Sequence, residues 1–305
     1  MKILVLGNSR IFQKKIYPAL KKLKNVKIEL ASKRKISPNL KISKYYQSYD
    51  EALKKTNAKI VYISLINSEH YTWAIKSLNN NKHVIIDKPI ALNLNQTKKI
   101  INLASKKKLL LSETIVFHKH FQFEKTFLKL DLSKPTKILC KFHIPKLEKN
   151  NFRNYKKYGG GCFQDMSPYA SYLIYIFFNK KKYFLKSQKK LNKKGIINNF
   201  NISVKSKNIL LKASFSFDSS YKNKIIIENK SKIYFLDYAF SPPIDKPLKL
   251  LLFNKTINKK YKINYIKQNT FYTYFNHLFK ILRKNKYNYF YKEIYEIAKI
   301  KAKIS

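Results

Sequence analysis

The first chemical signal in the chain is a glycine turn after a short apolar run. Residues 2–6, KILVL, end at Gly7, and Ser9 follows two positions later. A strand, a glycine turn and a helix in this order place backbone N–H groups where a dinucleotide pyrophosphate binds. Only Gly7 remains of the G-x-G-x-x-G pattern, because Ser9 and Phe12 occupy the other two glycine positions. Ser9 is small and can donate its hydroxyl, but Gly7 is also compatible with a plain tight turn.

Three basic or hydroxyl residues follow the second predicted strand. Ser32, Lys33 and Arg34 stand where an NAD-preferring site carries an acid for the ribose hydroxyls. A hydroxyl and two cations suit a 2′-phosphate, so we predict NADP(H), with NAD(H) as the second possibility. In so basic a chain these residues can equally be ordinary surface residues.

The sequence Asp87-Lys88-Pro89 closes the fourth predicted strand. Sheets of parallel strands hold their ligands at the carboxyl ends of the strands. An ammonium group there can hydrogen-bond the oxygen of a bound carbonyl, and a cationic nicotinamide nearby would lower its pKa. Pro89 stiffens the turn and has no amide hydrogen to satisfy. The alternative is a surface lysine before a loop proline.

Strands and helices must alternate to position these residues. Apolar runs typical of buried strands lie at 2–6, 26–32, 58–65, 82–87 and 109–116, and segments of helical spacing lie between them at 11–23, 49–55, 70–81 and 95–108. This alternation predicts an α/β fold, a Rossmann-type doubly wound parallel sheet, over residues 1–118. The remaining residues, 119–305, begin with a helical segment at 119–130, strand-like alternation at 134–146 and a glycine turn with an apolar helix at 159–178. Period-two alternation follows from about 183, and helical spacing returns at 271–304. They predict an α+β domain with a large open, mainly antiparallel sheet.

With the segment at 87–89, the chain resembles the Gfo/Idh/MocA oxidoreductases. The family's usual motif is E-K-P, and Asp87 replaces the glutamate. Further segments fit the family in the same order: LGNSRIFQKKIYPAL, NSEHYTWAIKSLNNNKHVIIDKPIA, ETIVFHKHFQ, NFRNYKKYGGGCFQDMSPYASYLI and YKNKIIIENKSKIYFLDYAFSPP. Four of the five glycines lie in two of these motifs, where the backbone needs them.

The resemblance implies roles for two residues after the glycine run. Many relatives carry D-x-x-x-H there, whereas this chain has Asp165 and Tyr169, a turn apart on one helical face. Tyrosine at this position is similar to the branch that holds glucose–fructose oxidoreductase, dihydrodiol dehydrogenase and nucleotide-sugar 3-ketoreductases. The resemblance implies that Asp165 binds a substrate hydroxyl or pairs with Lys88, and that Tyr169 protonates the alkoxide. Tyr169 can otherwise be one more core aromatic.

Other positions take their expected roles from the family's segments. His118 stands where relatives often carry arginine, and Gln122 belongs to the same closing motif. Arg153 is expected to bind a phosphate or carboxylate, or to be a solvated loop charge, and His70 can equally be a plain helix-start residue. The predicted catalytic residues are Lys88, Tyr169 and Asp165. The predicted substrate-binding residues are Arg153, Asp165, Tyr169 and His120. The predicted cofactor-binding residues are Gly7, Asn8, Ser9, Arg10, Ile11, Ser32, Lys33, Arg34, Leu65, Asn67, His70, Asp87 and Lys88.

The charge balance has two interpretations. The chain has 65 Lys and Arg against 16 Asp and Glu, a net charge of +49. Lysines spread over the whole chain, together with abundant Asn, Ile, Tyr and Phe, indicate a compositional bias, and a preference for polyanions is the alternative. No nucleic-acid motif accompanies the charge, so no specific nucleic-acid partner is expected.

The remaining features predict a soluble cytoplasmic protein. The two cysteines, Cys140 and Cys162, have neither metal-ligand nor disulfide spacing, which suits a reducing cytosol. No signal peptide is visible, and the longest apolar stretch, 172–178, is too short to span a membrane. We therefore expect no metal and no membrane partner, and the family resemblance implies a dimer or tetramer.

Three functions compete. The leading one is an NAD(P)-dependent oxidoreductase acting on a sugar or nucleotide-sugar carbonyl, with Lys88 and Tyr169 handling the proton. The second is a catalytically degenerate relative that serves as a cofactor-binding sensor or scaffold, motivated by the lost glycines, by Asp87 and by a short C-terminus. The third, a basic nucleic-acid-binding protein, rests on charge alone.

Overall fold

The computed structural model describes residues 1–34, 39–178 and 181–305. The chain forms two compact units. The first comprises Met1–Ile115 and Phe271–Ala298, and the second comprises Val116–Thr270 and Lys299–Ser305. None of the described helices is both long and apolar enough to cross a membrane.

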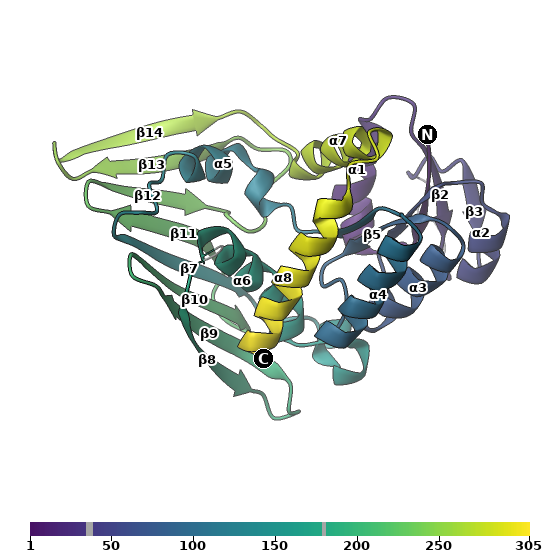
Figure 1. The fold of residues 1–305 in the computed structure, drawn as a ribbon, viewed down its shortest axis with the longest axis horizontal. Helices are drawn as coiled ribbons and strands as arrows, with labels where there is room; N and C mark the ends of the chain where they lie inside the picture. The colour runs from purple at the N-terminus through teal and green to yellow at the C-terminus, as the bar shows by residue number, and fades with distance from the viewer. Residues whose placement is uncertain (35–38, 179–180) are drawn as a thin grey trace. The chain divides into compact units, whose positions relative to one another are not determined.

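The first unit contains a six-stranded parallel sheet in the order β3-β2-β1-β4-β5-β6, of which Figure 1 labels β2, β3 and β5. Its strands are β1 (Lys2–Leu6), β2 (Lys27–Ala31), β3 (Lys44–Tyr46), β4 (Ile60–Ile63), β5 (His83–Asp87) and β6 (Leu111–Thr114). This is the Rossmann order, in which the chain reverses direction across the sheet between β1 and β4. The central strands are almost fully buried, as parallel strands covered on both faces must be. The predicted α/β fold is thus confirmed, although the three residues of β3 escaped the sequence prediction.

The α-helices of the first unit are regular, and a π-helical segment precedes the first of them. They are α1 (Tyr17–Lys21), α2 (Tyr49–Lys55), α3 (His70–Asn79), α4 (Leu94–Lys106) and α7 (Thr270–Arg283), with the first part of α8 (Asn288–Ile304). A π-helical segment, Phe12–Ile16, precedes α1. Phe12 stands there at the third glycine position of the fingerprint and is fully buried. The wider π-helical turn accompanies a large ring at a position where glycine usually permits close packing of helix on strand.

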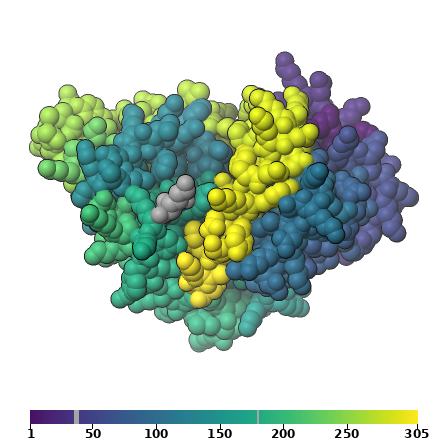
Figure 2. Space-filling model, viewed as in Figure 1, coloured from purple at the N-terminus to yellow at the C-terminus, as the bar shows by residue number. Residues whose placement is uncertain are grey.

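Tyrosines near the C-terminus tie their helices to the first unit. Tyr274 of α7 lies 2.6 Å from the Ser112 hydroxyl of β6, and Tyr287 donates to the Lys108 carbonyl at 2.6 Å. Helix α8 is seen as a yellow band on the surface shown in Figure 2. These bonds explain why residues 271–298 group with the Rossmann sheet.

The second unit contains an eight-stranded sheet in the order β14-β13-β12-β11-β7-β10-β9-β8. Its strands are β7 (Thr136–Ile144), β8 (Phe184–Leu191), β9 (Ile197–Lys205), β10 (Ile209–Phe217), β11 (Lys222–Asn229), β12 (Lys232–Asp237), β13 (Leu248–Asn254) and β14 (Lys259–Tyr265), and its helices are α5 (Phe121–Phe127) and α6 (Cys162–Phe178). Within this sheet, β7 and β10 form the one parallel pair among the described strands. Side chains alternate between buried and accessible, so the predicted, mainly antiparallel sheet is confirmed.

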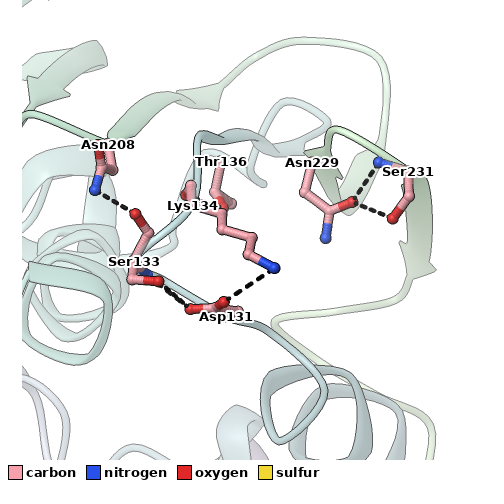
Figure 3. A network of polar contacts seen from close by, with 7 residues as sticks. All are labelled: Asp131, Ser133, Lys134, Thr136, Asn208, Asn229 and Ser231. Atoms are coloured by element: carbon pink, nitrogen blue, oxygen red, sulfur yellow. Dashed lines mark hydrogen bonds and ion pairs between the residues drawn. The ribbon is translucent and has the colours of Figure 1, made fainter.

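Side-chain hydrogen bonds fix the turns at one end of this sheet (Figure 3). The Ser133 amide and hydroxyl donate to Asp131 at 3.0 and 2.5 Å, and the Asn208 amide donates to the Ser133 carbonyl. Asn229 accepts similarly from the backbone and hydroxyl of Ser231, at 3.1 and 3.4 Å. Such Asx turns fix where β7 and β12 begin.

Candidate active site

The carboxyl ends of β1 and β4 meet closely at Gly7. Gly7 has φ +102°, and a Cβ there would overlap the Ser64 carbonyl oxygen and lie 2.7 Å from Leu65 Cδ2. Its amide donates to the Ala31 carbonyl at the end of β2, at 2.9 Å. Only glycine fits this crossing, which is the point of a Rossmann sheet where a dinucleotide binds. The residues present at this edge therefore fit the predicted cofactor.

A chain of side-chain hydrogen bonds connects the glycine turn with the Asp87-Lys88-Pro89 segment. Ser64 Oγ donates to Asp87 Oδ2 at 2.7 Å and lies 2.7 Å from Ser9 Oγ. Because the Ser64 proton points at Asp87, Ser9 is the donor to Ser64. The Phe12 amide in turn donates to Ser9 Oγ at 3.0 Å. We call Ser9, Ser64 and Asp87 the hydroxyl chain.

Asp87 receives a second proton donor on its other oxygen, the Tyr62 hydroxyl. Burial raises the pKa of Asp87, while the hydrogen bonds from Tyr62 and Ser64 act in the opposite direction. Burial, and next the charge of Asp87, raise the pKa of Tyr62 well above its ordinary value. Two hydroxyl donors on one carboxyl group indicate that Asp87 is ionised and acts as an acceptor.

The turn that carries Lys88 is held from two sides. His70 is fully buried, and its ring nitrogens lie 2.6 Å from the Pro89 carbonyl oxygen and 3.1 Å from that of Leu65. The Ile90 amide donates to Glu113 Oε1 at 2.9 Å. Burial lowers the pKa of His70, and the hydrogen bond to Pro89 opposes that shift. His70 thus fastens the turn that carries Lys88 to the loop after β4.

The segment after β2 presents two exposed cations but not the neighbouring hydroxyl. Ser32 is buried, and its Oγ accepts from the Arg34 amide at 3.0 Å and donates to the Arg34 carbonyl at 3.1 Å. The Tyr45 hydroxyl donates to the Ser32 carbonyl at 2.6 Å. Lys33 and Arg34 are exposed, with Lys33 Nζ 5.9 Å above the ring of Tyr49. The turn orders the backbone and leaves the two cations accessible.

The other predicted cofactor residues fall into buried and exposed groups. Asn8 and Asn67 are buried, and Asn8 Oδ1 accepts from the side-chain amide of Gln13 at 2.9 Å. Arg10 and Ile11 are exposed, Ile11 by 39% of its surface. An exposed isoleucine beside a nucleotide-binding turn offers an apolar surface to a flat ring.

In the second unit, the glycine run packs against the loop that carries Arg153. The Gly161 amide donates to the Arg153 carbonyl at 2.8 Å, and a Cβ on Gly160 would lie 2.5 Å from that oxygen. Arg153 Nε forms an ion pair with Asp165 Oδ1 at 3.0 Å, and their side chains are 31% and 11% exposed. Asp165, predicted to pair with Lys88 or a substrate hydroxyl, thus has Arg153 as a partner within its own unit.

Tyr169 lies one turn beyond Asp165 on α6, in an aromatic cluster. Its ring is half-buried, and its centroid lies 5.8, 5.4 and 5.7 Å from those of Phe117, Phe142 and Phe240, respectively. The cluster fixes the direction in which the phenol points. Nearby, His118 stacks on Tyr172 with a centroid separation of 4.4 Å.

His120 caps helix α5 from a buried position. Its Nδ1 accepts from the Gln122 amide at 3.2 Å, and burial lowers the pKa of His120 to about 4. The ring is therefore neutral near pH 7 and carries its proton on Nε2. That Nε2 is buried without a hydrogen-bond partner among the described residues. The Gln122 side-chain amide donates to the Asp237 carbonyl at 2.8 Å.

Sequence inspection missed Tyr62 and Ser64. A sequence feature that could have indicated them is the pair of hydroxyl residues at the end of an otherwise apolar strand. Buried hydroxyl groups need hydrogen-bond partners. Among the described residues, no cluster of three or more His, Cys, Asp or Glu side chains is arranged to hold a metal ion.

Residues 1–115 match the model of the Gfo/Idh/MocA family, described as an oxidoreductase family with an NAD-binding Rossmann fold. The N-terminal 115 residues are thus similar to this family, as the resemblance inferred from the sequence predicted.

Curated relatives match part of the chain. An uncharacterized oxidoreductase, ORF334 of Rhizobium meliloti, is 25% identical over 54% of this chain and 52% of its own length. The dTDP-3,4-didehydro-2,6-dideoxy-alpha-D-glucose 3-reductase of Saccharopolyspora spinosa is 28% identical over 40% of this chain and 38% of its own length. The chain thus spans about half or less of the length of these two relatives.

Solved structures match over nearly the whole chain. KijD10, a 3-ketoreductase from Actinomadura kijaniata solved with NADP and TDP-benzene, has a TM-score of 0.90 and 17% identity, covering 98% of this chain and 94% of its own. The aldose-aldose oxidoreductase from Caulobacter crescentus, complexed with glycerol, has a TM-score of 0.84 and 14% identity, covering 100% and 96%. At these identities the likeness establishes the two-part fold.

Proposed function

We propose that the chain is an NADP(H)-dependent oxidoreductase that reduces or forms a carbonyl group on a nucleotide-linked sugar. The single observation that carries this proposal is the strand edge at Gly7, where a Cβ would overlap the Ser64 carbonyl at the switch point of a Rossmann sheet. The family match of residues 1–115 supports the same reading.

The preference for NADP(H) rests on Lys33 and Arg34. Both are exposed at the end of β2, where an acidic residue would select the unphosphorylated ribose. Two cations favour a 2′-phosphate electrostatically. A similar fold, that of KijD10, has been solved with NADP.

The chemistry divides between the cofactor and the protein. The nicotinamide, when bound, supplies or accepts the hydride. Lys88, on a turn held by His70 and Glu113, is proposed to hydrogen-bond the substrate oxygen. Tyr169 is proposed to give that oxygen its proton during reduction and to take it back during oxidation. KijD10 has also been solved with a tyrosine or a lysine replaced.

The substrate class follows from the second unit and from the relatives. Arg153, paired with Asp165, is proposed to meet a phosphate or hydroxyl of the substrate, and the buried Nε2 donor of His120 to meet a substrate oxygen. Relatives named for dTDP-sugar 3-ketone reduction make a sugar nucleotide our preferred substrate.

Cofactor binding and turnover test this proposal separately. We expect NADPH fluorescence to report saturable binding at micromolar concentrations, with at least tenfold weaker binding of NADH. Lys88→Ala should retain NADPH binding and lose turnover by about a hundredfold or more. The matched control is Lys54→Ala, an exposed lysine on α2 outside the strand edge, which should turn over like the wild type. No binding at millimolar NADPH would overturn the proposal.

The second candidate is a cofactor-binding sensor without catalysis, favoured by Ser9, Phe12 and Asp87 at positions where the family carries other residues. It predicts NADPH binding with no Lys88-dependent turnover of any carbonyl substrate. A basic nucleic-acid-binding function has no support beyond the net charge of +49.

A further inference from the structure

The hydroxyl chain has a direction that follows from simple proton counting. Asp87 accepts from Ser64 at 2.7 Å and from Tyr62 on its other oxygen. Ser64 has one proton, and it is committed to Asp87. Ser64 can therefore only accept from Ser9, whose oxygen lies 2.7 Å away.

The same counting leaves Ser9 without a proton for a ligand. Its hydroxyl donates to Ser64, and its oxygen accepts from the Phe12 amide at 3.0 Å. An oxygen that accepts from the amide three residues later is the side-chain cap of a helix N-terminus. In this arrangement Ser9 has no hydroxyl proton left to donate to a bound group.

We propose that Asp87 and Ser64 are positioning residues for the nucleotide-binding turn. Asp87 accepts the hydrogen bond of Ser64, Ser64 accepts that of Ser9, and Ser9 is thereby fixed as the helix cap. The inference rests on the proposed function. Backbone amides of the turn, and not the Ser9 hydroxyl, then meet the pyrophosphate. The hydroxyl chain thereby restrains the turn after β1, in which Ser9 and Phe12 replace two of the three fingerprint glycines.

The position of Asp87 connects this restraint with the rest of the strand edge. Ser64 follows β4, Asp87 ends β5, and Ser9 lies in the turn after β1. The hydroxyl chain therefore connects the carboxyl ends of the three adjacent central strands β1, β4 and β5. Asp87 also directly precedes Lys88. One carboxylate therefore orders both the nucleotide-binding turn after β1 and the start of the turn that carries Lys88.

A matched pair of variants separates the hydroxyl chain from general effects on Asp87. Ser64→Ala removes one hydroxyl donor from Asp87 and cuts the chain to Ser9. Tyr62→Phe also removes one hydroxyl donor from Asp87 but leaves the chain to Ser9 intact. We expect Ser64→Ala to raise the Kd for NADPH about tenfold and Tyr62→Phe to change it less than twofold.

A double variant tests whether Ser64 acts through Ser9. Ser9→Ala should weaken NADPH binding about as much as Ser64→Ala does. If the two act as one unit, the variant with both changes should bind NADPH no more weakly than Ser9→Ala alone. Effects that multiply would overturn the proposal, as would an unchanged Kd for Ser64→Ala or equal losses in Ser64→Ala and Tyr62→Phe.

Hydrogen exchange of the cofactor-free chain provides a readout that needs no activity. Exchange of the Phe12 amide should be faster in Ser64→Ala, by about tenfold, and unchanged in Tyr62→Phe. If the wild type binds no NADPH, the proposed function fails, and this exchange measurement still decides whether the hydroxyl chain restrains the turn. Equal exchange in all three proteins would contradict the inference.

Discussion

At the scale of single residues, burial decides which titratable groups are charged. His120 is 2% exposed, and its pKa lies at about 4 because burial disfavours the imidazolium. In the unfolded chain a histidine binds its proton near pH 6.5. As the pH falls from 6.5 towards 4, the unfolded state therefore gains a proton that the native state does not bind, and the protein loses stability.

His120→Asn is predicted to flatten this pH dependence. Asparagine retains a helix-cap acceptor but does not titrate. Between about pH 7.5 and about pH 5, the wild type should lose about 2 kcal/mol more free energy of unfolding than the variant does. Urea unfolding at the two pH values measures the difference. His70 and His83, whose pKa values burial also lowers, remain in both proteins. Equal losses would show that His120 titrates normally.

At the scale of elements, two glycines of left-handed conformation differ in what surrounds them. Gly7 has φ +102°, and a Cβ there would lie 2.7 Å from Leu65 Cδ2 and overlap the Ser64 carbonyl. Gly195 has φ +67° and nothing within 4 Å of such a Cβ. Both positions disfavour alanine conformationally, but only Gly7 adds steric overlap between two strand ends.

Gly7→Ala and Gly195→Ala therefore form a matched pair. We predict that Gly195→Ala costs about 1 kcal/mol of stability, the conformational penalty alone. Gly7→Ala should cost about 3 kcal/mol or more and abolish detectable NADPH binding. Chemical denaturation and NADPH titration check both variants. A Gly7→Ala protein as stable as Gly195→Ala would contradict the close approach of β1 and β4.

Strands and helices were predicted correctly where a buried face gives the apolar residues a regular spacing, and strands without that spacing were missed. β1, β4 and β5 are apolar runs with clear ends, and all three were predicted. Strands β8 and β14 were not identified: they form the two edges of the large sheet, and their lysines obscure the alternation.

Site residues followed the same division. Gly7 and Lys88 were predicted from local patterns and Asp165 from the family resemblance, because the strand, turn or helix that carries each is contiguous in the sequence. The contacts of Ser9 with Ser64 and of Ser64 with Asp87 join residues 55 and 23 positions apart. No local pattern encodes such a pairing, since it depends on which strands become neighbours.

At the scale of the whole molecule, the charge is the dominant feature. A net charge of +49 repels itself in the folded state, and dissolved salt screens that repulsion. Raising NaCl from about 50 mM to about 500 mM should therefore increase the midpoint of urea unfolding. The same salt should weaken NADPH binding, because it screens Lys33 and Arg34 as well. A stability that falls as salt rises would show that attractive ion pairs outweigh the net repulsion.

The central claim is that the chain transfers hydride between NADPH and a sugar carbonyl, with Lys88 serving the substrate oxygen. Turnover of NADPH deuterated at the reactive ring carbon, with a nucleotide-linked keto sugar, tests it most directly. We predict one deuterium on the former carbonyl carbon of the product, seen by mass spectrometry, and label transfer about a hundredfold slower or more with Lys88→Ala. Saturable NADPH binding with no label transferred to any keto sugar nucleotide would contradict the claim and favour a sensor.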